Sequence, residues 1–141
     1  MSKRVYLDTN IMLDLLGERE PYYNSIAQIA TLADQKKLQL IVSPISFATV
    51  NYFLSKYDGV SIAKEKLRKF KVLCEISKID ETIVEKGLNS NFEDFEDSLQ
   101  YFCAVDSDCE IIITRNAKDF KNSLLPIMSA EEFIISIASK N

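Results

Sequence analysis

The sequence predicts an α/β fold in which a parallel sheet of about five strands is wrapped by helices. Short runs of Val, Ile and Leu without polar alternation are typical of parallel strands that are buried on both faces. These runs alternate with helical patterns, as they do where right-handed crossovers connect parallel strands. With 141 residues, of which 47% are hydrophobic and 27% charged, the chain is expected to form a single domain over residues 1–141.

The predicted elements follow one another in a regular order. Three runs predict strands most clearly, and two do so more weakly: 4–8, 38–43 and 110–114, then 72–76 and 126–128. The helical patterns between them span 21–36, 44–56, 62–70, 81–88, 92–105 and 130–139. Helix starts are indicated by Ser43 followed by proline, and by capping-box patterns that begin at Ser90 and Ser129. The stretch YDGVS at 57–61 predicts a turn.

The composition excludes several kinds of catalytic site. The chain has no histidine, so Ser-His or Cys-His nucleophile activation and histidine-bound zinc cannot occur. Its three cysteines lack a metal-binding spacing and lie in or beside apolar segments, which predicts reduced, mostly buried thiols. Glycine-rich phosphate loops are absent from the sequence. The net charge of -4 argues against binding nucleic acid through bulk positive charge and is compatible with bound cations.

The sequence gives no sign of a membrane protein. Its apolar runs are far shorter than the ~20 residues that cross a bilayer. The amino-terminal stretch MSKRVYLD lacks the apolar segment of a signal peptide. We therefore expect a cytoplasmic protein without membrane contact.

Asp8 directly follows the first predicted strand, within the stretch VYLDTN. A carboxylate at the carboxyl end of a parallel strand lies where open α/β sheets bind their ligands. The alternative is a helix N-cap, because aspartate readily accepts hydrogen bonds from helical N–H groups. The residues alone leave both interpretations open.

A second acidic segment, NFEDFEDSLQYFCA, covers residues 91–104. Asp94 and Asp97 are three residues apart in it and would share one face of a helix. Acids in a first helical turn can simply complement the helix dipole, at about 0.3–1 kcal/mol each. Four acids within five residues exceed that need and repel one another. We therefore interpret the segment as part of a cation site.

A third polar segment, in CEIIITRNAKDF, follows the strand predicted at 110–114. If this strand lies parallel and next to 4–8, Thr114, Asn116 and Asp119 approach Asp8 at one end of the sheet. Two carboxylates about 4 Å apart repel by roughly 4 kcal/mol at an effective dielectric constant of about 20. Such a cluster favours a divalent ion, and oxygen ligands with open water positions suit Mg²⁺ or Mn²⁺.

Four segments of the chain read, in order, YLDTNIMLDLL, SPISFATVNYFLSK, DFEDSLQYFCA and IIITRNAKDF. In this order and spacing they resemble the PIN-domain nucleases, which include the VapC-type toxins of toxin–antitoxin pairs. The resemblance covers residues 4–133. It implies a PIN-like, Rossmann-like three-layer α/β/α sandwich and metal-dependent hydrolysis of phosphodiester bonds, usually in RNA. It also implies a homodimer and, for a toxin, an antitoxin protein as partner.

The resemblance also assigns residues to the site. Asp8 and Asp97 match the family's metal-binding aspartates, and Asp94 is an additional acid found in this branch. Asn10 matches a polar residue that orients the first aspartate, while Asn116 stands where many members have aspartate. The predicted catalytic residues are thus Asp8, Asp94 and Asp97. The predicted metal ligands are Asp8, Asp94, Asp97, Asn116 and Asp119, with Asn10, Thr114 and Thr49 as supporting residues.

The largest departure from the family lies in the helix predicted at 44–56. The family usually carries a glutamate at the position that corresponds to Thr49 in this chain. Threonine supplies a hydroxyl but no charge, so the predicted site would hold a cation less tightly. An ordinary helix-packing role for Thr49 is the alternative.

The sequence thus predicts a Mg²⁺- or Mn²⁺-dependent endoribonuclease in which Arg115 and Lys118 contact the RNA backbone. The alternative is a PIN-fold module with weakened catalysis that acts by binding protein or RNA, which Thr49 and Asn116 favour. A phosphatase with an aspartate nucleophile of the D-x-D-x-T type is disfavoured, because its second aspartate and its threonine are both missing.

Overall fold

The computed structural model describes residues 3–139, so the outermost residues of the domain predicted over 1–141 lie outside the described range. Within that range the chain forms one sheet of five parallel strands in the order β3-β2-β1-β4-β5. The strands are β1 (Lys3–Leu7), β2 (Leu38–Val42), β3 (Cys74–Ile76), β4 (Ile111–Ile113) and β5 (Ile127–Met128). All the predicted strands are confirmed, with boundaries that differ by one or two residues.

The helices alternate with the strands as predicted. They are α1 (Thr9–Leu16), α2 (Tyr23–Asp34), α3 (Pro44–Asp58), α4 (Val60–Lys71), α5 (Glu81–Leu88), α6 (Phe95–Asp106), α7 (Ala130–Ala138) and the 3-10 helix η1 (Ala117–Phe120). The sequence does not predict α1 or η1. α1 is only eight residues long and buries Thr9, Ile11, Met12, Leu13 and Asp14. With only two turns, α1 is too short for its apolar period to separate it clearly from the preceding strand.

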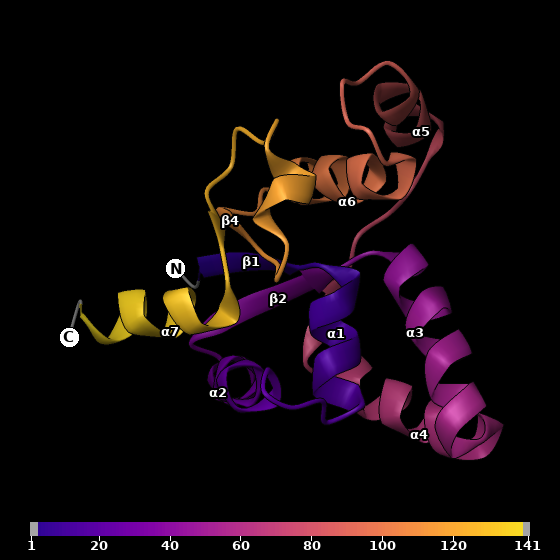
Figure 1. Ribbon diagram of the computed structural model, residues 1–141, viewed down its shortest axis with the longest axis vertical. Coiled ribbons are helices and arrows are strands. Elements are labelled where there is room, and N and C mark those ends of the chain that lie inside the picture. Colours follow the sequence, from indigo (N-terminus) through magenta and orange to yellow (C-terminus); the bar gives the residue numbers. More distant parts are fainter. Residues whose placement is uncertain (1–2, 140–141) are drawn as a thin grey trace.

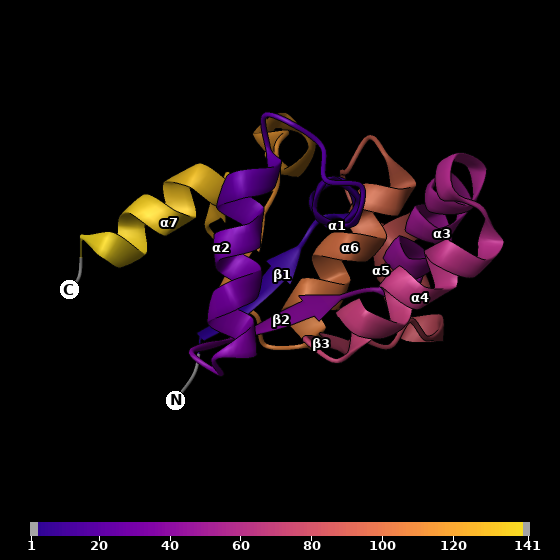
Figure 2. The ribbon, with the colours of Figure 1, turned by 90° about the horizontal axis from the view of Figure 1, so that it is seen from below.

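Alternate residues of the central strands point to opposite faces of the sheet. Val5 and Leu7 belong to one hydrophobic cluster, whereas Tyr6 belongs to another. The first cluster packs under α1, α2, α3, α4 and α7, and the second under α5, α6 and η1. Figure 1 and Figure 2 show the two groups of helices on opposite sides of β1 and β2. The predicted α/β/α sandwich is therefore confirmed.

Side-chain caps fix the start of several helices. Ser43 and Ser129 cap α3 and α7 as predicted, the latter in a complete capping box. The start predicted at Ser90 is wrong. The hydroxyl of Ser90 donates to the carbonyl of Gly87, 2.8 Å away, and so helps to end α5 instead. α6 begins five residues after Ser90, with Asp94 as its N-cap.

The predicted turn at 57–61 is the junction between α3 and α4. Gly59 joins the two helices with a φ of 91°, a conformation that favours glycine because it has no Cβ. None of the helices within residues 3–139 is both long and apolar enough to cross a bilayer.

Candidate active site

Asp8 lies at the carboxyl end of β1, beside the end of β4. Its backbone N–H donates to the carbonyl of Ile113, 3.0 Å away, so the pairing of the two strands continues up to Asp8. The residue is only 4% exposed. Its Oδ2 accepts a hydrogen bond of 2.7 Å from the Thr114 hydroxyl. The helix-cap interpretation is wrong, because Asp8 occupies the N-cap position of α1 without a side-chain cap hydrogen bond.

Asp94 and Asp97 lie at the start of α6. Asp94 precedes the helix as its N-cap, and its Oδ1 accepts the Asp97 N–H at 3.0 Å. Asp94 therefore caps α6, which the sequence did not predict, and it lies before the helix and not on a helical face shared with Asp97. Asp97 lies in the first turn and is half-buried. The two neighbouring acids are thus held differently, one by a backbone hydrogen bond and one by partial burial.

The electrostatics show that the acids predicted from three separate segments come together. Burial raises the pKa of Asp97 to about 7, and the nearby negative charges act in the same direction: Asp94, Asp8, Asp119 and Glu96. Burial also raises the pKa of Asp8, while hydrogen bonds from Thr114, Gln100 and the Thr9 backbone oppose that shift. The charges of Asp8, Asp97 and Asp119 are therefore near enough to influence one another.

Gln100 is a buried polar residue of this site that the sequence analysis missed. Its Oε1 accepts hydrogen bonds from the Thr9 N–H at 3.1 Å and from the Tyr6 hydroxyl at 3.3 Å. Gln100 also hydrogen-bonds Asp8 and so favours the ionised carboxylate. The sequence did contain an indication of this role. Gln100 follows Asp97 by three residues, so the two side chains lie on the same side of α6.

The carboxylates gather in one region but not around one point. Within residues 3–139, no three acidic or cysteine side chains are arranged to hold a single metal ion. The five-ligand set predicted from the sequence is therefore not assembled in this structure. Mg²⁺ commonly takes one or two protein carboxylates and keeps several water ligands. Asp8, which the Thr114 hydroxyl contacts, and Asp97, whose pKa the Asp8 charge raises, are the two carboxylates to consider for an ion of that kind.

The segment after β4 carries the remaining predicted polar residues. The Asn116 N–H donates to the Thr114 hydroxyl at 3.1 Å, which ties the segment to the residue that holds Asp8. Asn116, Lys118 and Asp119 are all exposed. Among them, Asp119 is close enough for its charge to raise the pKa of both Asp8 and Asp97.

Arg115, in the same segment, binds a carboxylate that the sequence analysis missed. Asp14 is fully buried in α1 and accepts hydrogen bonds from Arg115 Nε at 2.7 Å and Nη2 at 3.3 Å. The Arg115 guanidinium also lies 4.2 Å from the centre of the Tyr22 ring. Arg115 is thus engaged within the protein and does not extend freely toward solvent. The sequence could have indicated this pair, because Asp14 lies inside the apolar run IMLDLL and a buried carboxylate needs a cationic partner.

The sequence of this chain is similar to that of a known protein family. Residues 4–118 match the model of the PIN domain family. The chain belongs to the PIN domain family. It is 30% identical over 137 residues to Ribonuclease VapC1 of Aquifex aeolicus (strain VF5), with 94% of each chain covered. The predicted resemblance to VapC-like PIN domains is therefore confirmed.

Solved structures share the fold of this PIN domain. VapBC2 from Rickettsia felis, bound to a promoter DNA fragment, contains a chain with a TM-score of 0.67 and 23% identity, covering 89% of this chain and 97% of that one. A chain of DNA-bound VapBC from Salmonella typhimurium has a TM-score of 0.68 and 15% identity, with 92% and 99% covered.

Asn10 and Thr49, which were predicted to support the site, lie on α1 and α3. Asn10 is exposed in the first turn of α1, and among the described residues no hydrogen bond joins its side chain to Asp8. The Ser46 hydroxyl lies 2.7 Å from the Thr9 hydroxyl, which holds α3 next to Asp8. Thr49 is one turn further along α3. It is half-buried and belongs to neither hydrophobic cluster.

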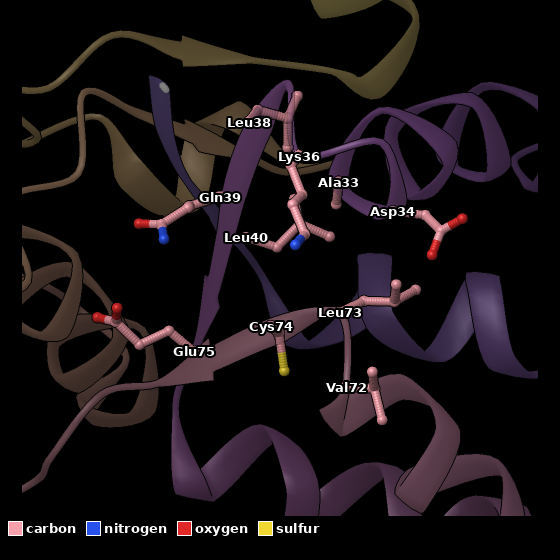
Figure 3. A pocket seen from close by; sticks show the side chains of 10 residues that line it. All are labelled: Ala33, Asp34, Lys36, Leu38, Gln39, Leu40, Val72, Leu73, Cys74 and Glu75. Atoms are coloured by element: carbon pink, nitrogen blue, oxygen red, sulfur yellow. The ribbon is translucent and has the colours of Figure 1, made fainter. Parts of the chain in front are cut away.

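A separate hollow lies at the amino-terminal end of the PIN-domain sheet, where β2 and β3 begin (Figure 3). It encloses about 390 Å³ and includes Cys74 in its lining. This hollow is at the opposite end of β2 from the candidate site. Burial raises the pKa of the Cys74 thiol to about 12, so the thiol is protonated and unreactive at neutral pH.

All three cysteines are free, and Cys103 and Cys109 are buried, in agreement with the prediction of mostly buried thiols.

Proposed function

We propose that this chain is a Mg²⁺- or Mn²⁺-dependent endoribonuclease and acts as the toxin of a toxin–antitoxin pair. The observation that carries the proposal is the pairing of buried Asp8 with Asp97, whose pKa is raised by burial and by neighbouring carboxylates. Repelling carboxylates at the carboxyl edge of a parallel sheet favour a divalent cation. The family membership and the similarity to a VapC ribonuclease support RNA as the substrate.

In this proposal, Asp8 and Asp97 hold the ion, and Asp94, Asn116 and Asp119 surround it. When bound, such an ion activates water and neutralises charge on the scissile phosphate. Thr114 and Gln100 orient the Asp8 carboxylate through their hydrogen bonds. Lys118, exposed next to Asp119, contacts the RNA backbone in this proposal, and its exposure supports that role. Since the chain has no histidine, proton transfer from water falls to the carboxylates.

The proposed activity is tested with purified protein and an end-labelled single-stranded RNA. We expect cleavage in Mg²⁺ or Mn²⁺, loss of cleavage in excess EDTA, and recovery when the metal is restored. Asp8→Asn protein prepared in parallel controls for contaminating nucleases. Cleavage that persists in EDTA, or that is equal in the Asp8→Asn preparation, would contradict the proposal.

A second candidate function is a binding module of the same fold with weakened catalysis. The observation that favours it is that no three acids surround one point within the described residues. The family resemblance also leads us to expect acids at the positions of Thr49 and Asn116, where this chain has none. The same assay separates the two functions. Tight RNA binding without cleavage at any metal concentration supports the binding module.

Thr49→Glu tests whether α3 faces the metal site. Position 49 is one turn from Ser46, which contacts Thr9 beside Asp8. A glutamate there would add a carboxylate to the acidic region, and because position 49 is half-buried its charge need not be fully desolvated. We expect Mn²⁺ affinity, measured by calorimetry, to rise several-fold, and cleavage at limiting metal to rise with it.

Ala48→Glu is the matched control, because it adds the same charge at an exposed neighbouring position that points about 100° away around the helix. It should leave Mn²⁺ affinity unchanged. If Thr49→Glu lowers the melting midpoint without a gain in metal affinity, or if both variants gain equally, position 49 does not face the site.

The partners proposed for the chain are RNA, an antitoxin protein and a second copy of the chain. The antitoxin is supported by the similarity to chains in VapBC structures. A homodimer remains an inference from the family and is checked by light scattering of the purified chain.

A further inference from the structure

A cleft runs along α1 away from the candidate active site. α1 and α3 pack against each other and lie side by side (Figure 1, Figure 2), and the cleft lies between them. It starts at Asn10, two residues after Asp8, and extends along α1 to Gly17. Its volume is about 300 Å³. Arg115, from the segment after β4, closes the end of the cleft near the sheet.

The cleft carries a surplus of positive charge that is fixed in place. Arg115 and Arg19 both line it, and both guanidinium groups approach the buried carboxylate of Asp14. One carboxylate therefore orients two cations, and the group keeps a net positive charge. The acid in the cleft lining, Asp58, is already bound by the Lys66 ammonium at 3.0 Å. This fixed surplus stands out in a chain with a net charge of -4.

Aromatic rings form the opposite wall of the cleft. Phe53 and Tyr57 reach it from α3, and they are 37% and 77% exposed. Neither ring belongs to the two hydrophobic clusters of the core. Proteins bind single-stranded nucleic acid by stacking bases on exposed aromatic rings while cationic side chains contact the phosphates. The cleft presents both kinds of group across a space of nucleotide size.

We propose that this cleft binds a nucleotide that flanks the cleaved bond of the RNA, with its phosphate at Arg19 and Arg115 and its base against Tyr57 and Phe53. The proposal rests on the proposed ribonuclease function and adds a substrate-binding subsite to it. Asn10 lines the cleft and is only two residues from Asp8 in the chain, so the cleft begins close to the candidate site and one RNA strand can span both. The cleft follows α1 for about 10 Å, from Asn10 to Gly17. Its far end therefore suits a nucleotide next to the cleaved bond and not the nucleotide at the bond itself.

The test measures RNA binding separately from cleavage. All variants are made in an Asp97→Asn background, and their affinity for a short fluorescein-labelled single-stranded RNA of mixed sequence is measured by fluorescence anisotropy. Tyr57→Ala should weaken binding roughly tenfold because it removes a stacking surface. Tyr57→Phe should restore most of the affinity, because the ring is kept. Ile135→Ala is the control: Ile135 is 64% exposed on α7 and does not line the cleft.

Arg19→Gln tests the phosphate contact by a different readout. Arg19 is half-exposed, so its loss should not disturb the fold. We expect the slope of log affinity against log salt concentration to fall by about one, because one phosphate contact is lost.

Unchanged RNA affinity in both Tyr57→Ala and Arg19→Gln overturns the proposal, as does an equal loss in Ile135→Ala. This outcome is distinct from failure of the proposed function. If the wild-type chain does not cleave RNA but Tyr57→Ala still weakens RNA binding, the subsite stands and the nuclease activity does not.

Discussion

Asp97→Asn is expected to reduce metal-dependent RNA cleavage at least about 100-fold while the fold is retained. Asp97 is half-buried, the Asp8 charge helps to raise its pKa, and its carboxylate is one of the two assigned to the ion in the proposed function. The amide keeps the shape of the side chain but lacks the charge that an ion needs. The initial rate of cleavage at saturating Mn²⁺ checks this result.

Asp106→Asn is the matched control for this substitution. Asp106 is exposed at the other end of the same helix, α6, about 14 Å along the axis from Asp97. Its loss should leave cleavage unchanged. Cleavage by Asp97→Asn at the wild-type rate would show that another carboxylate holds the ion.

The same substitution should change how the stability of the metal-free protein depends on pH. The folded-state pKa of Asp97 is about 7, raised from 3.8 by burial and by neighbouring acids. Between these two values the folded state holds a proton that the unfolded state has released, so the free energy of unfolding falls as the pH rises from about 4 to about 7. Above pH 7, Asp97 is ionised in the folded state and is fully repelled by the neighbouring carboxylates.

Asp97→Asn removes that part of the pH dependence. In EDTA, the variant should therefore have a higher melting midpoint than the wild type at pH 8, and this advantage should shrink at pH 5. Thermal melts of both proteins at the two pH values check the result. A difference in midpoint that does not vary with pH would contradict the placement of Asp97 among the other carboxylates.

Arg115→Ala is expected to lower the free energy of unfolding by about 3 kcal/mol, and the melting midpoint by about 10 °C. The variant leaves the Asp14 carboxylate fully buried, with Arg19 Nη1 at 3.7 Å as the nearest remaining cation. Asp14→Asn should cost less, because the Arg115 side chain that loses its partner is 30% exposed and can be hydrated. Urea unfolding of both variants measures the difference.

The double variant, Asp14→Asn with Arg115→Ala, closes the thermodynamic cycle. It contains no unpaired buried charge, so it should be more stable than the sum of the two single effects predicts. A cost below about 1 kcal/mol for Arg115→Ala, together with additive single effects, would show that this pair behaves as an ordinary surface ion pair.

The sequence by itself determined the architecture and the region of the site. Uninterrupted apolar runs are typical of strands buried on both faces, and their alternation with helical patterns predicted the parallel sheet that the structure shows. Parallel strands place their carboxyl ends at one edge, so the approach of Asp8 to the segment after Thr114 could also be predicted. Strand ends and helix periods are local properties, and local properties can be read from a sequence.

Only the tertiary structure decided what each polar side chain does at that edge. Asp8 and Asp94 are both suited to capping a helix, yet only Asp94 caps one, because the Thr114 hydroxyl from a distant strand binds Asp8. The sequence could not pair Asp14 with Arg115, which are 101 residues apart, and so it predicted Arg115 as an RNA contact without showing that it also binds a buried acid. Asp14 and Arg115 become partners because the segment after β4 lies against α1 in the folded chain. That packing depends on contacts between residues far apart in the chain, which no local pattern specifies.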